Sequence, residues 1–307
     1  MSNAAREIGL DLTRWYVRYG PGAVGKAAVV ENFLNAGLRD HPRLRRARTR
    51  FGATFLTDTQ DLIQRYLYEF GVWEPHLTHW LEARLKPGDV FIDAGANIGY
   101  YSVLASKLVG TAGGVVAIEA SPDFHRRLTT HARMNGCTNV RAVRAALSDR
   151  ERKVRFVLAS SRNMGANSVV PYDGVAESTF ETVAVPLPEV VTEEEIARAR
   201  VIKIDVEGAE GAVLRGLAPM LGRLRPDAEL AIEVTPQRMG ELGDSVEELL
   251  ETLKFHGFHT YQLPNDYTAR NYPASRTGEP RAARRCRQPI VEESELIFSR
   301  TDAETLP

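Results

Sequence analysis

The chain has 307 residues, enough for one large domain with an extension, and its formal charge of −1 gives no global attraction to nucleic acid or anionic membranes. Its hydrophobic share of 43% and charged share of 26% are typical of globular proteins and exclude a disordered or fibrous chain. Two cysteines, Cys137 and Cys286, exclude a disulfide framework and a cysteine-rich metal site, so we expect a cytoplasmic protein.

Residues 1–80 are predicted to form a mainly helical extension that caps the core. Apolar periodicity and turn residues indicate helices over 11–20, 25–38 and 59–85 and a hairpin over 48–58. The arginine-rich segment 39–50 is interpreted as a solvated connector. The chain holds no run of about 20 apolar residues, so we expect no membrane span.

Residues 81–307 are predicted to form an α/β core, because apolar strands alternate with helices. The predicted strands cover 89–95, 114–120, 139–149, 200–208, 228–236, 258–263 and 293–300. The predicted helices cover 98–110, 121–136, 209–221 and 245–257. This alternation predicts a parallel sheet with helices on both faces. No helix separates the last two strands, so one of them is predicted to be antiparallel, and residues 153–189 read as an insertion of short strands.

The run "DAGANIG" ends the first core strand and opens a helix, at the edge where open α/β sheets bind ligands. Gly95 lets the backbone approach a ligand, and Gly99 lets the new helix pack against the sheet. The amides around Asn97 favour an anionic group at the helix start. Asp93 instead accepts hydrogen bonds from an ammonium group or orients the turn, so a ligand with both ammonium and carboxylate fits this turn.

Glu119 ends the next strand, where an acid can accept both hydroxyls of a ribose. A nucleoside joined to an amino acid would bridge the two strand ends, which describes S-adenosylmethionine. NAD fits less well, because its fingerprint is G-x-G-x-x-G and the spacing here is G-x-x-x-G. Ala146 and Leu147, at the third strand end, are expected to flank the adenine with backbone groups and an apolar wall.

With these motifs the sequence is similar to the FkbM family of class I S-adenosylmethionine-dependent methyltransferases. The similarity runs from about Phe51 to Arg300 and rests on "GVWEP", "LKPGDVFIDAGANIGYYS", "AIEASP", "AALSD" and "VIKIDVEGAEGAVLRG". It implies a Rossmann-like, seven-stranded methyltransferase sheet and O-methylation of hydroxyls on sugars or other natural products. It also implies that Glu74 lies over the cofactor, with Trp73 and Tyr66 as walls. Family members commonly carry two acids after the insertion, where this chain has "VPLPEVV".

Methyl transfer to an alcohol requires a base, or a metal that acidifies the hydroxyl. The catalytic candidates at the fourth and fifth strand ends are Lys203, Asp205, Glu207 and Glu233. Asp205 also lies where the methionine part of the cofactor is expected. Asp205 and Glu233 on adjacent strands can alternatively hold a magnesium-type cation. A salt bridge for Lys203 and turn stabilisation for Asp205 are the structural alternatives.

The leading hypothesis is an S-adenosylmethionine-dependent O-methyltransferase acting on a small-molecule or glycan hydroxyl. The alternatives are N-methylation of a small-molecule amine and a non-catalytic cofactor-binding protein. We expect no nucleic-acid partner, and a homodimer formed by the N-terminal helices is one of two arrangements left open. The segment 265–289 is rich in arginine and is read either as a solvated loop or as a lid for an acidic substrate, with Tyr267 and Tyr272 packing on a sugar.

Overall fold

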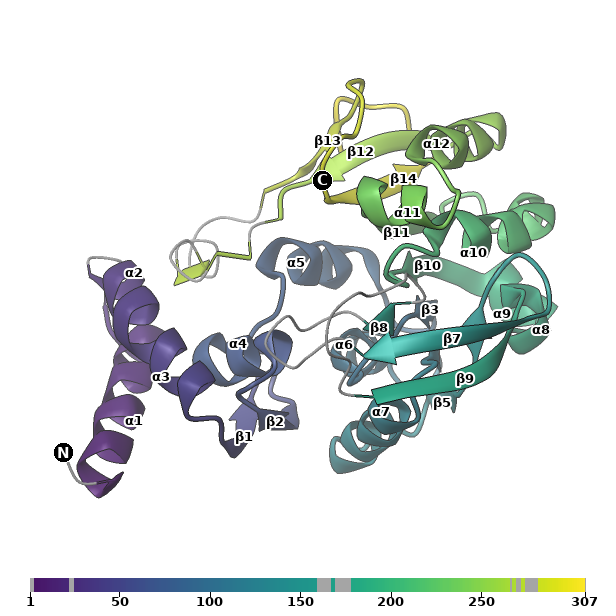
Figure 1. The fold of residues 1–307 in the computed structure, drawn as a ribbon. Coiled ribbons are helices and arrows are strands. Elements are labelled where there is room, and N and C mark those ends of the chain that lie inside the picture. The colour runs from purple at the N-terminus through teal and green to yellow at the C-terminus, as the bar shows by residue number, and fades with distance from the viewer. Residues whose placement is uncertain are drawn as a thin grey trace. The chain divides into compact units, whose positions relative to one another are not determined.

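The computed structural model describes residues 3–21, 25–158, 167–168, 178–265, 267–268, 272–273 and 281–306. The chain divides into two compact units (Figure 1). The first comprises Met1–His79, Ser160–Gly165 and Asn265–Pro280, and the second comprises Trp80–Ala159, Ala166–Pro264 and Arg281–Pro307. The first unit therefore includes segments that we expected within the core.

The first unit is built from helices and one hairpin. Its elements are α1 (Asn3–Tyr19), α2 (Lys26–Val29), the π-helix η1 (Val30–Leu34), α3 (Asn35–Asp40), β1 (Leu44–Arg48), β2 (Thr54–Asp58), α4 (Leu62–Phe70) and the start of α5 (Pro75–Arg84). The side chain of Asp61 accepts a hydrogen bond from the Gln64 amide and starts α4, and Gly71 at φ 74° ends it.

The prediction for the arginine-rich segment was wrong, because part of it is strand β1. Leu44 pairs with Asp58 and Arg48 with Thr54, so the hairpin begins four residues earlier than predicted. Only Ala47 of β1 is buried; Arg46 and Arg48 are exposed on the opposite face, and Arg45 is half-buried on the face of Ala47. A strand with one buried side chain leaves little apolar periodicity to detect.

Among the described residues, the central sheet of the second unit has nine strands. In spatial order they are β15 (Thr305–Leu306), β13 (Ala283–Arg285), β12 (His259–Leu263), β14 (Ser294–Ser299), β11 (Glu229–Val234), β10 (Ala199–Ile204), β3 (Val90–Ala94), β4 (Gly114–Ile118) and β5 (Val140–Val143). All seven predicted strands are present, and β13 and β15 extend the edge beside β12. The predicted antiparallel strand is β14, which runs against both of its neighbours.

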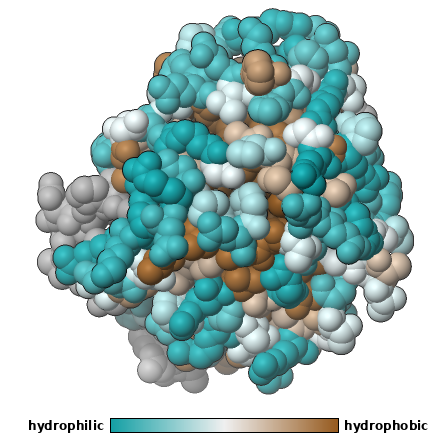
Figure 2. All heavy atoms as spheres, turned by 90° about the vertical axis from the view of Figure 1, so that its right-hand side faces the viewer, coloured by the Kyte–Doolittle hydropathy of each residue, from teal (hydrophilic) through white to brown (hydrophobic). Residues whose placement is uncertain are grey.

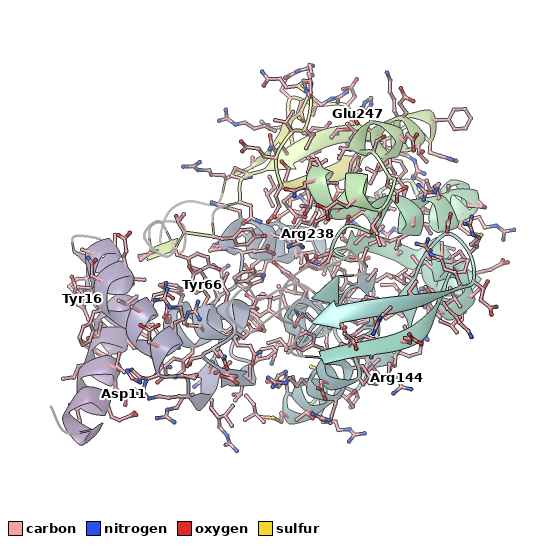
Figure 3. The ribbon with its side chains drawn as sticks, viewed as in Figure 1. Asp11, Tyr16, Tyr66, Arg144, Arg238 and Glu247 are labelled. Carbon is pink, nitrogen blue, oxygen red and sulfur yellow. The ribbon has the colours of Figure 1, made fainter. Side chains whose placement is uncertain are left out.

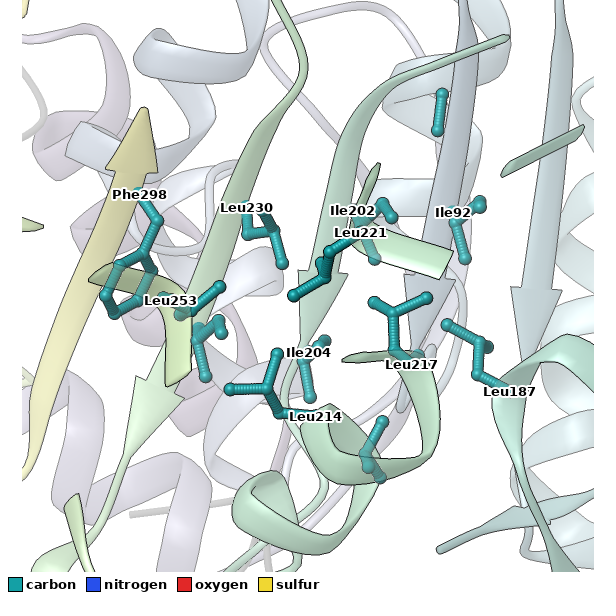
Figure 4. Packing of buried hydrophobic residues seen from close by; sticks show 14 of the residues in the cluster. Ile92, Leu187, Ile202, Ile204, Leu214, Leu217, Leu221, Leu230, Leu253 and Phe298 are labelled. Atoms are coloured by element: carbon teal, nitrogen blue, oxygen red, sulfur yellow. The ribbon is translucent and has the colours of Figure 1, made fainter. Parts of the chain in front are cut away.

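Helices pack on both faces of this sheet. They are α6 (Tyr100–Val109), α7 (Pro122–Met134), α8 (Leu187–Val190), α9 (Glu193–Arg198), α10 (Glu210–Leu217), the 3₁₀ helix η2 (Ala218–Arg223), α11 (Pro236–Glu241) and α12 (Val246–Phe255). Ile92 packs in the apolar cluster with Leu217 of α10, as Figure 4 shows, whereas its neighbour Asp93 bonds to Ser102 of α6. Successive strand residues point to opposite faces, so α6 and α10 cover opposite sides.

The described part of the insertion forms, together with β6, a separate four-stranded sheet. Its order is β6 (Ala146–Leu147), β9 (Ser178–Val185), β7 (Arg152–Leu158) and β8 (Asn167–Ser168). The predicted strand over 139–149 is therefore divided between two sheets, because Ala146 pairs with Ala184 of β9 instead of continuing β5. The side of the molecule with α8, α9 and α10 faces the viewer in Figure 2, and hydrophilic residues cover most of it. Within the described residues, no helix has the length and apolarity that crossing a bilayer requires.

Glu69 of α4 is a buried acid in the first unit. Its side chain is fully buried, and neither carboxyl oxygen has a hydrogen-bond partner among the described residues. Burial raises the pKa of Glu69 to about 8, which the charge of Arg65 one helical turn earlier opposes only in part. The folded protein therefore holds a proton here at a pH where the unfolded chain has lost it.

This proton makes stability dependent on pH. Between the unfolded pKa of 4.5 and the folded value of about 8, the folded state binds more protons, so the free energy of unfolding falls as pH rises. Glu69→Gln mimics the protonated form, so we expect it to raise Tm at pH 9 by at least about 3 °C and to change little at pH 5. Calorimetry at both pH values tests this, with Glu247→Gln, on the exposed side of α12 (Figure 3), as the control. An equal effect at both pH values would contradict the expectation.

Candidate functional site

The candidate site lies where the parallel strands of the second unit end together. The register aligns Ala94 of β3 with Ile118 of β4 and with Ile204 of β10. Glu119 and Asp205 directly follow two of these strands, so both acids lie at the same edge of the sheet. The structure thus brings together the predicted residues of the glycine turn, the second strand end and the fourth strand end.

The turn after β3 is fixed by its neighbours on both sides. The amides of Gly95 and Ala96 both donate to the Ile118 carbonyl, at 3.0 and 2.9 Å. Gly95 has φ 88°, and a Cβ there would collide with the backbone carbonyl of Asp205. Gly95 is therefore required by the close approach of two strand-end turns, a constraint separate from the ligand approach that we predicted.

The helix contact that requires glycine at position 99 differs from the predicted one. It has φ 86°, and a Cβ there would strike the side chain of Leu128 in α7. Its absent side chain therefore lets the start of α6 meet α7, whereas we predicted contact with the sheet. Asn97 adopts φ 50°, and its Oδ1 accepts a hydrogen bond of 2.7 Å from the Ile98 amide, which stabilises this left-handed residue.

Glu119 ties the glycine turn to the end of β4. Its two carboxyl oxygens accept hydrogen bonds of 2.8 Å, one from the amide of Asn97 and one from the amide of Ser121. Burial raises the pKa of Glu119 to about 7, although both amide bonds act to lower it. Each carboxyl oxygen has two lone pairs, so the group can still accept further hydrogen bonds while it holds the turn.

Asp93 lies beneath the turn with 1% of its surface exposed. Its Oδ2 accepts a hydrogen bond of 2.6 Å from Ser102 in the first turn of α6. Its Oδ1 is buried and has no hydrogen-bond partner among the residues that the structure describes. Burial raises the pKa of Asp93, against the opposing effects of Lys203 and Ser102. Of the two predicted roles, this arrangement displays the anchoring one. The other role, a hydrogen bond from an ammonium group of the ligand, stays a prediction.

Lys203 and Asp205 form an ion pair at the end of β10. The Lys203 Nζ donates to Asp205 Oδ2 at 2.6 Å and lies 5.2 Å from the centre of the Tyr101 ring. The lysine side chain is 3% exposed, whereas that of Asp205 is 29% exposed. The pair therefore presents a carboxylate to the edge of the sheet and keeps the ammonium behind it.

The two acids that follow Asp205 after β10 have different partners. Glu207 adopts φ 56° and forms an ion pair with Arg238 of α11. Glu210, at the start of α10, is buried, and its carboxyl accepts from the amides of Val206 and Gly208 at 3.1 and 3.0 Å. Burial raises the pKa of Glu210 to about 7. Glu210 thus stabilises the turn after β10 as Glu119 stabilises the turn after β3.

Glu233 is a half-buried residue of β11, and its cross-strand partner in β14 is the buried Glu295. The β10–β11 register places Asp205 one step beyond the last aligned pair, next to Glu233. Within the described residues, no three-ligand group includes Asp205. The ammonium of Lys203 already supplies the positive charge that a magnesium ion would bring to Asp205, so these residues fit an ion pair better than the predicted metal site.

Ala146 and Leu147 belong to β6 of the small sheet and are buried. The Ala146 side chain packs with Val154, Phe156 and Ala184, and Leu147 belongs to the main apolar cluster. Both side chains are therefore committed to packing, which leaves only their backbone groups for the predicted adenine contact.

Glu74 belongs to the first unit, where it lies in a polar and aromatic cluster. It adopts φ 39°, and its Oε1 accepts from the Tyr267 hydroxyl at 2.5 Å and the Asn265 amide at 3.1 Å. The Tyr267 ring stacks on Trp73, with centroids 5.3 Å apart, and the Tyr66 hydroxyl donates to the Tyr267 carbonyl.

Sequence reasoning grouped Trp73 and Tyr66 with Glu74 but did not find that Tyr267 and Tyr272 also contact Glu74. Tyr272 is 1% exposed and accepts from the Glu74 amide at 2.8 Å, so it does not offer a face to a sugar as predicted. Of the predicted lid, residues 265–289, positions 266, 269–271 and 274–280 lie outside the described residues.

Comparisons with known proteins point to one enzyme class. A family model described as "Methyltransferase FkbM domain" matches residues 93–260. The hexuronic acid methyltransferase AglP of Haloferax volcanii is 31% identical over 133 residues, which cover 43% of this chain and 52% of that protein. A protein-L-isoaspartate O-methyltransferase of Methanococcus aeolicus is 25% identical over 91 residues, 30% of this chain and 35% of that protein. The first match thus covers about half of the length of its relative, and the second covers about a third.

Solved structures resemble the fold more distantly. A SAM-dependent O-methyltransferase from Thermotoga maritima has a TM-score of 0.41 at 14% identity, covering 83% of this chain and 76% of that one. A precorrin-6y C5,15-methyltransferase from Geobacter metallireducens has a TM-score of 0.39 at 12% identity, covering 73% and 86%.

The two amide bonds of Glu119 predict a measurable structural role. Glu119→Ala leaves the Asn97 and Ser121 amides without their acceptor, so we expect the free energy of unfolding to fall by about 2 kcal/mol. Denaturant titration measures this, and Glu247→Ala on the exposed side of α12 should stay within about 0.5 kcal/mol of the parent. Equal losses in the two variants would show that Glu119 does not hold the turn.

Proposed function

This chain belongs to the FkbM methyltransferase family, and on that premise we propose that it transfers a methyl group from S-adenosylmethionine to a hydroxyl of an acidic sugar. The family consists of S-adenosylmethionine-dependent enzymes. The observation that carries the proposal is that the family match, over residues 93–260, contains the glycine turn, Glu119 and the Lys203–Asp205 pair of the strand-end site.

The chemistry of the strand ends fits a cationic cofactor. The residues that end β3, β4, β10 and β11 carry the carboxyl groups of Asp93, Glu119, Asp205 and Glu233 and the ammonium of Lys203. This excess of acid favours a ligand with positive charge and disfavours the pyrophosphate of NAD. S-adenosylmethionine offers a methyl group on a positively charged sulfur that leaves as a neutral thioether. In this proposal Glu119 accepts from the ribose hydroxyls, and Asp93 Oδ1 and Asp205 attract the cationic end.

Asp205 is the proposed base for the acceptor hydroxyl. Its Oδ2 is held by Lys203 at 2.6 Å, so the carboxylate has a fixed direction, and Oδ1 is available to take the hydroxyl proton. Lys203 is a positioning residue in this assignment. Glu207 is less suited to the base role because Arg238 binds its carboxylate, and Glu233 remains a proposed acceptor-side group.

A sugar acceptor is proposed from two independent lines. The relative in Haloferax volcanii is a hexuronic acid methyltransferase and is 31% identical over the matched region. In residues 281–289 the exposed arginines are Arg281, Arg284 and Arg287, of which Arg287 pairs with Glu304. The positive charge of this segment is suited to an acidic acceptor. The alternatives are methylation of a small-molecule amine and a non-catalytic cofactor-binding protein. The two free thiols favour a reducing compartment for any of these roles.

Cofactor identity has a direct test by calorimetry. We expect S-adenosylmethionine to bind the purified chain and NAD not to bind. Glu119→Gln removes the charge and replaces one acceptor oxygen with a donor, so we expect at least about a tenfold loss of affinity. The exposed Glu247→Gln should bind like the parent. Binding of NAD in preference, or full affinity in Glu119→Gln, would contradict the proposal.

The reaction has a test with labelled methyl donor and a panel of acceptors. We expect transfer to glucuronic or galacturonic acid units in preference to neutral hexoses, and no transfer to amines. Label on amines alone would support the N-methyltransferase alternative, and binding without transfer to any acceptor would support a non-catalytic protein.

The base and the metal are tested in the same assay. Asp205→Asn should lower kcat about 10²- to 10⁴-fold, because the amide cannot take the proton. Activity should persist in EDTA, since Lys203 supplies the positive charge at Asp205. Unchanged kcat in Asp205→Asn, or loss of activity on chelation that magnesium restores, would contradict these roles.

A further inference from the structure

Helix α1 carries a second apolar face, whose large side chains are exposed in the described part of the chain. Its buried apolar side chains, Leu10 and Val17, are 5% and 1% exposed. Ile8, Leu12, Trp15 and Tyr19 are 61%, 63%, 60% and 64% exposed. At 100° per residue these four lie within about 60° of one another and nearly opposite Leu10 and Val17. We call these four residues the α1 stripe.

The spacing of the α1 stripe is that of a helix–helix seam. Steps of four, three and four residues match the alternating a and d positions of a coiled coil. The stripe is also symmetric about the point between Thr13 and Arg14. A second copy of α1 running antiparallel therefore places Ile8 against Tyr19 and Leu12 against Trp15, and a twofold axis repeats both contacts.

The area of the stripe fits a small symmetric dimer. Aromatic side chains present about 150–250 Å² each, and Trp15 and Tyr19 are three-fifths or more exposed. With Ile8 and Leu12, two copies would cover on the order of 1,000 Å², near the lower bound for a specific interface. Four large apolar side chains in one line are unfavourable in contact with water, so we expect another surface to cover them.

The charges around the stripe favour a second copy over an anionic membrane. Helices that lie on membranes carry lysine and arginine beside their apolar face. Here Arg14 Nε donates to the Tyr68 carbonyl at 2.7 Å and its guanidinium lies over the Tyr68 ring, and Arg18 is buried. The stripe is instead bordered by Asp11 and Tyr16, both labelled on α1 in Figure 3.

We propose that the α1 stripe is the interface of a homodimer, in which α1 of two copies of this chain pack antiparallel. The stripe shares no residue with the proposed methyl-transfer site, so loss of the dimer and loss of cofactor binding are separate outcomes. Because the stripe is exposed within one copy, polar substitutions there should leave the fold of each copy intact.

Sedimentation equilibrium of the full chain between 1 and 100 µM, roughly the range of moderate affinities, tests the interface. We expect a dimer for the parent and a dimer dissociation constant raised roughly 100-fold or more for Leu12→Glu with Trp15→Glu. Phe255→Glu is the matched control, because Phe255 is an 86% exposed apolar residue of α12 in the second unit, and it should remain dimeric. Unchanged circular dichroism and S-adenosylmethionine binding would show that each variant is folded.

Cysteine cross-linking tests the antiparallel direction. In the proposed dimer residue 8 faces residue 19 of the second copy, so a mixture of Ile8→Cys and Tyr19→Cys chains should form a disulfide-linked pair under mild oxidation. Each variant alone should cross-link no more than the parent, whose Cys137 and Cys286 give the background. Efficient cross-linking of either variant with itself would overturn the antiparallel assignment.

Two results would overturn the dimer itself. One is a parent chain that stays monomeric at 100 µM, whether or not it sediments with vesicles of phosphatidylcholine and phosphatidylglycerol. The other is a dimer that persists with unchanged affinity in Leu12→Glu with Trp15→Glu, because the interface would then lie elsewhere on the chain.

Discussion

The site depends on the way the end of β4 fixes the turn after β3. Three consecutive amides, those of Gly95, Ala96 and Asn97, donate to only two residues, the carbonyl of Ile118 and the carboxyl of Glu119. The Ala94 carbonyl accepts from Asp205 on the other side. Three strand ends are thus joined by short polar contacts before any ligand arrives, so the functional groups on them are already in place.

Buried carboxyl groups hold much of the geometry of these strand-end turns, and burying them has an electrostatic cost. Glu119 and Glu210 each bind two backbone amides of a strand-end turn, and burial raises the pKa of each to about 7. Aspartate or glutamate with exposed oxygens would bind the same amides less firmly, because water would compete for them. Lys203 offsets part of the charge at Asp205 directly, whereas Asp93 is balanced only by Ser102 and by its proximity to Lys203.

Local patterns in the sequence were enough to predict the order of strands and helices and the positions of the acids at the strand ends. They were not enough where the partner is distant in sequence. The collision that requires glycine at 95 is with Asp205, and the hydroxyl that binds Glu74 comes from Tyr267, 193 residues away. The division of the third strand likewise depends on β9, which no feature of residues 139–149 encodes. Spatial pairings between remote segments decide these points, and a single sequence does not record them.

The first unit combines three segments that are far apart in the sequence, Met1–His79, Ser160–Gly165 and Asn265–Pro280. Glu74 and Trp73 contact Tyr267, and Glu74 also contacts Asn265. Both partners are synthesised long after α4. The aromatic cluster of this unit therefore cannot form until residues 265–267 have been synthesised. For this reason the N-terminal segment alone does not complete the unit. Replacing this unit in evolution is correspondingly difficult, because three separate segments of the chain would have to change together.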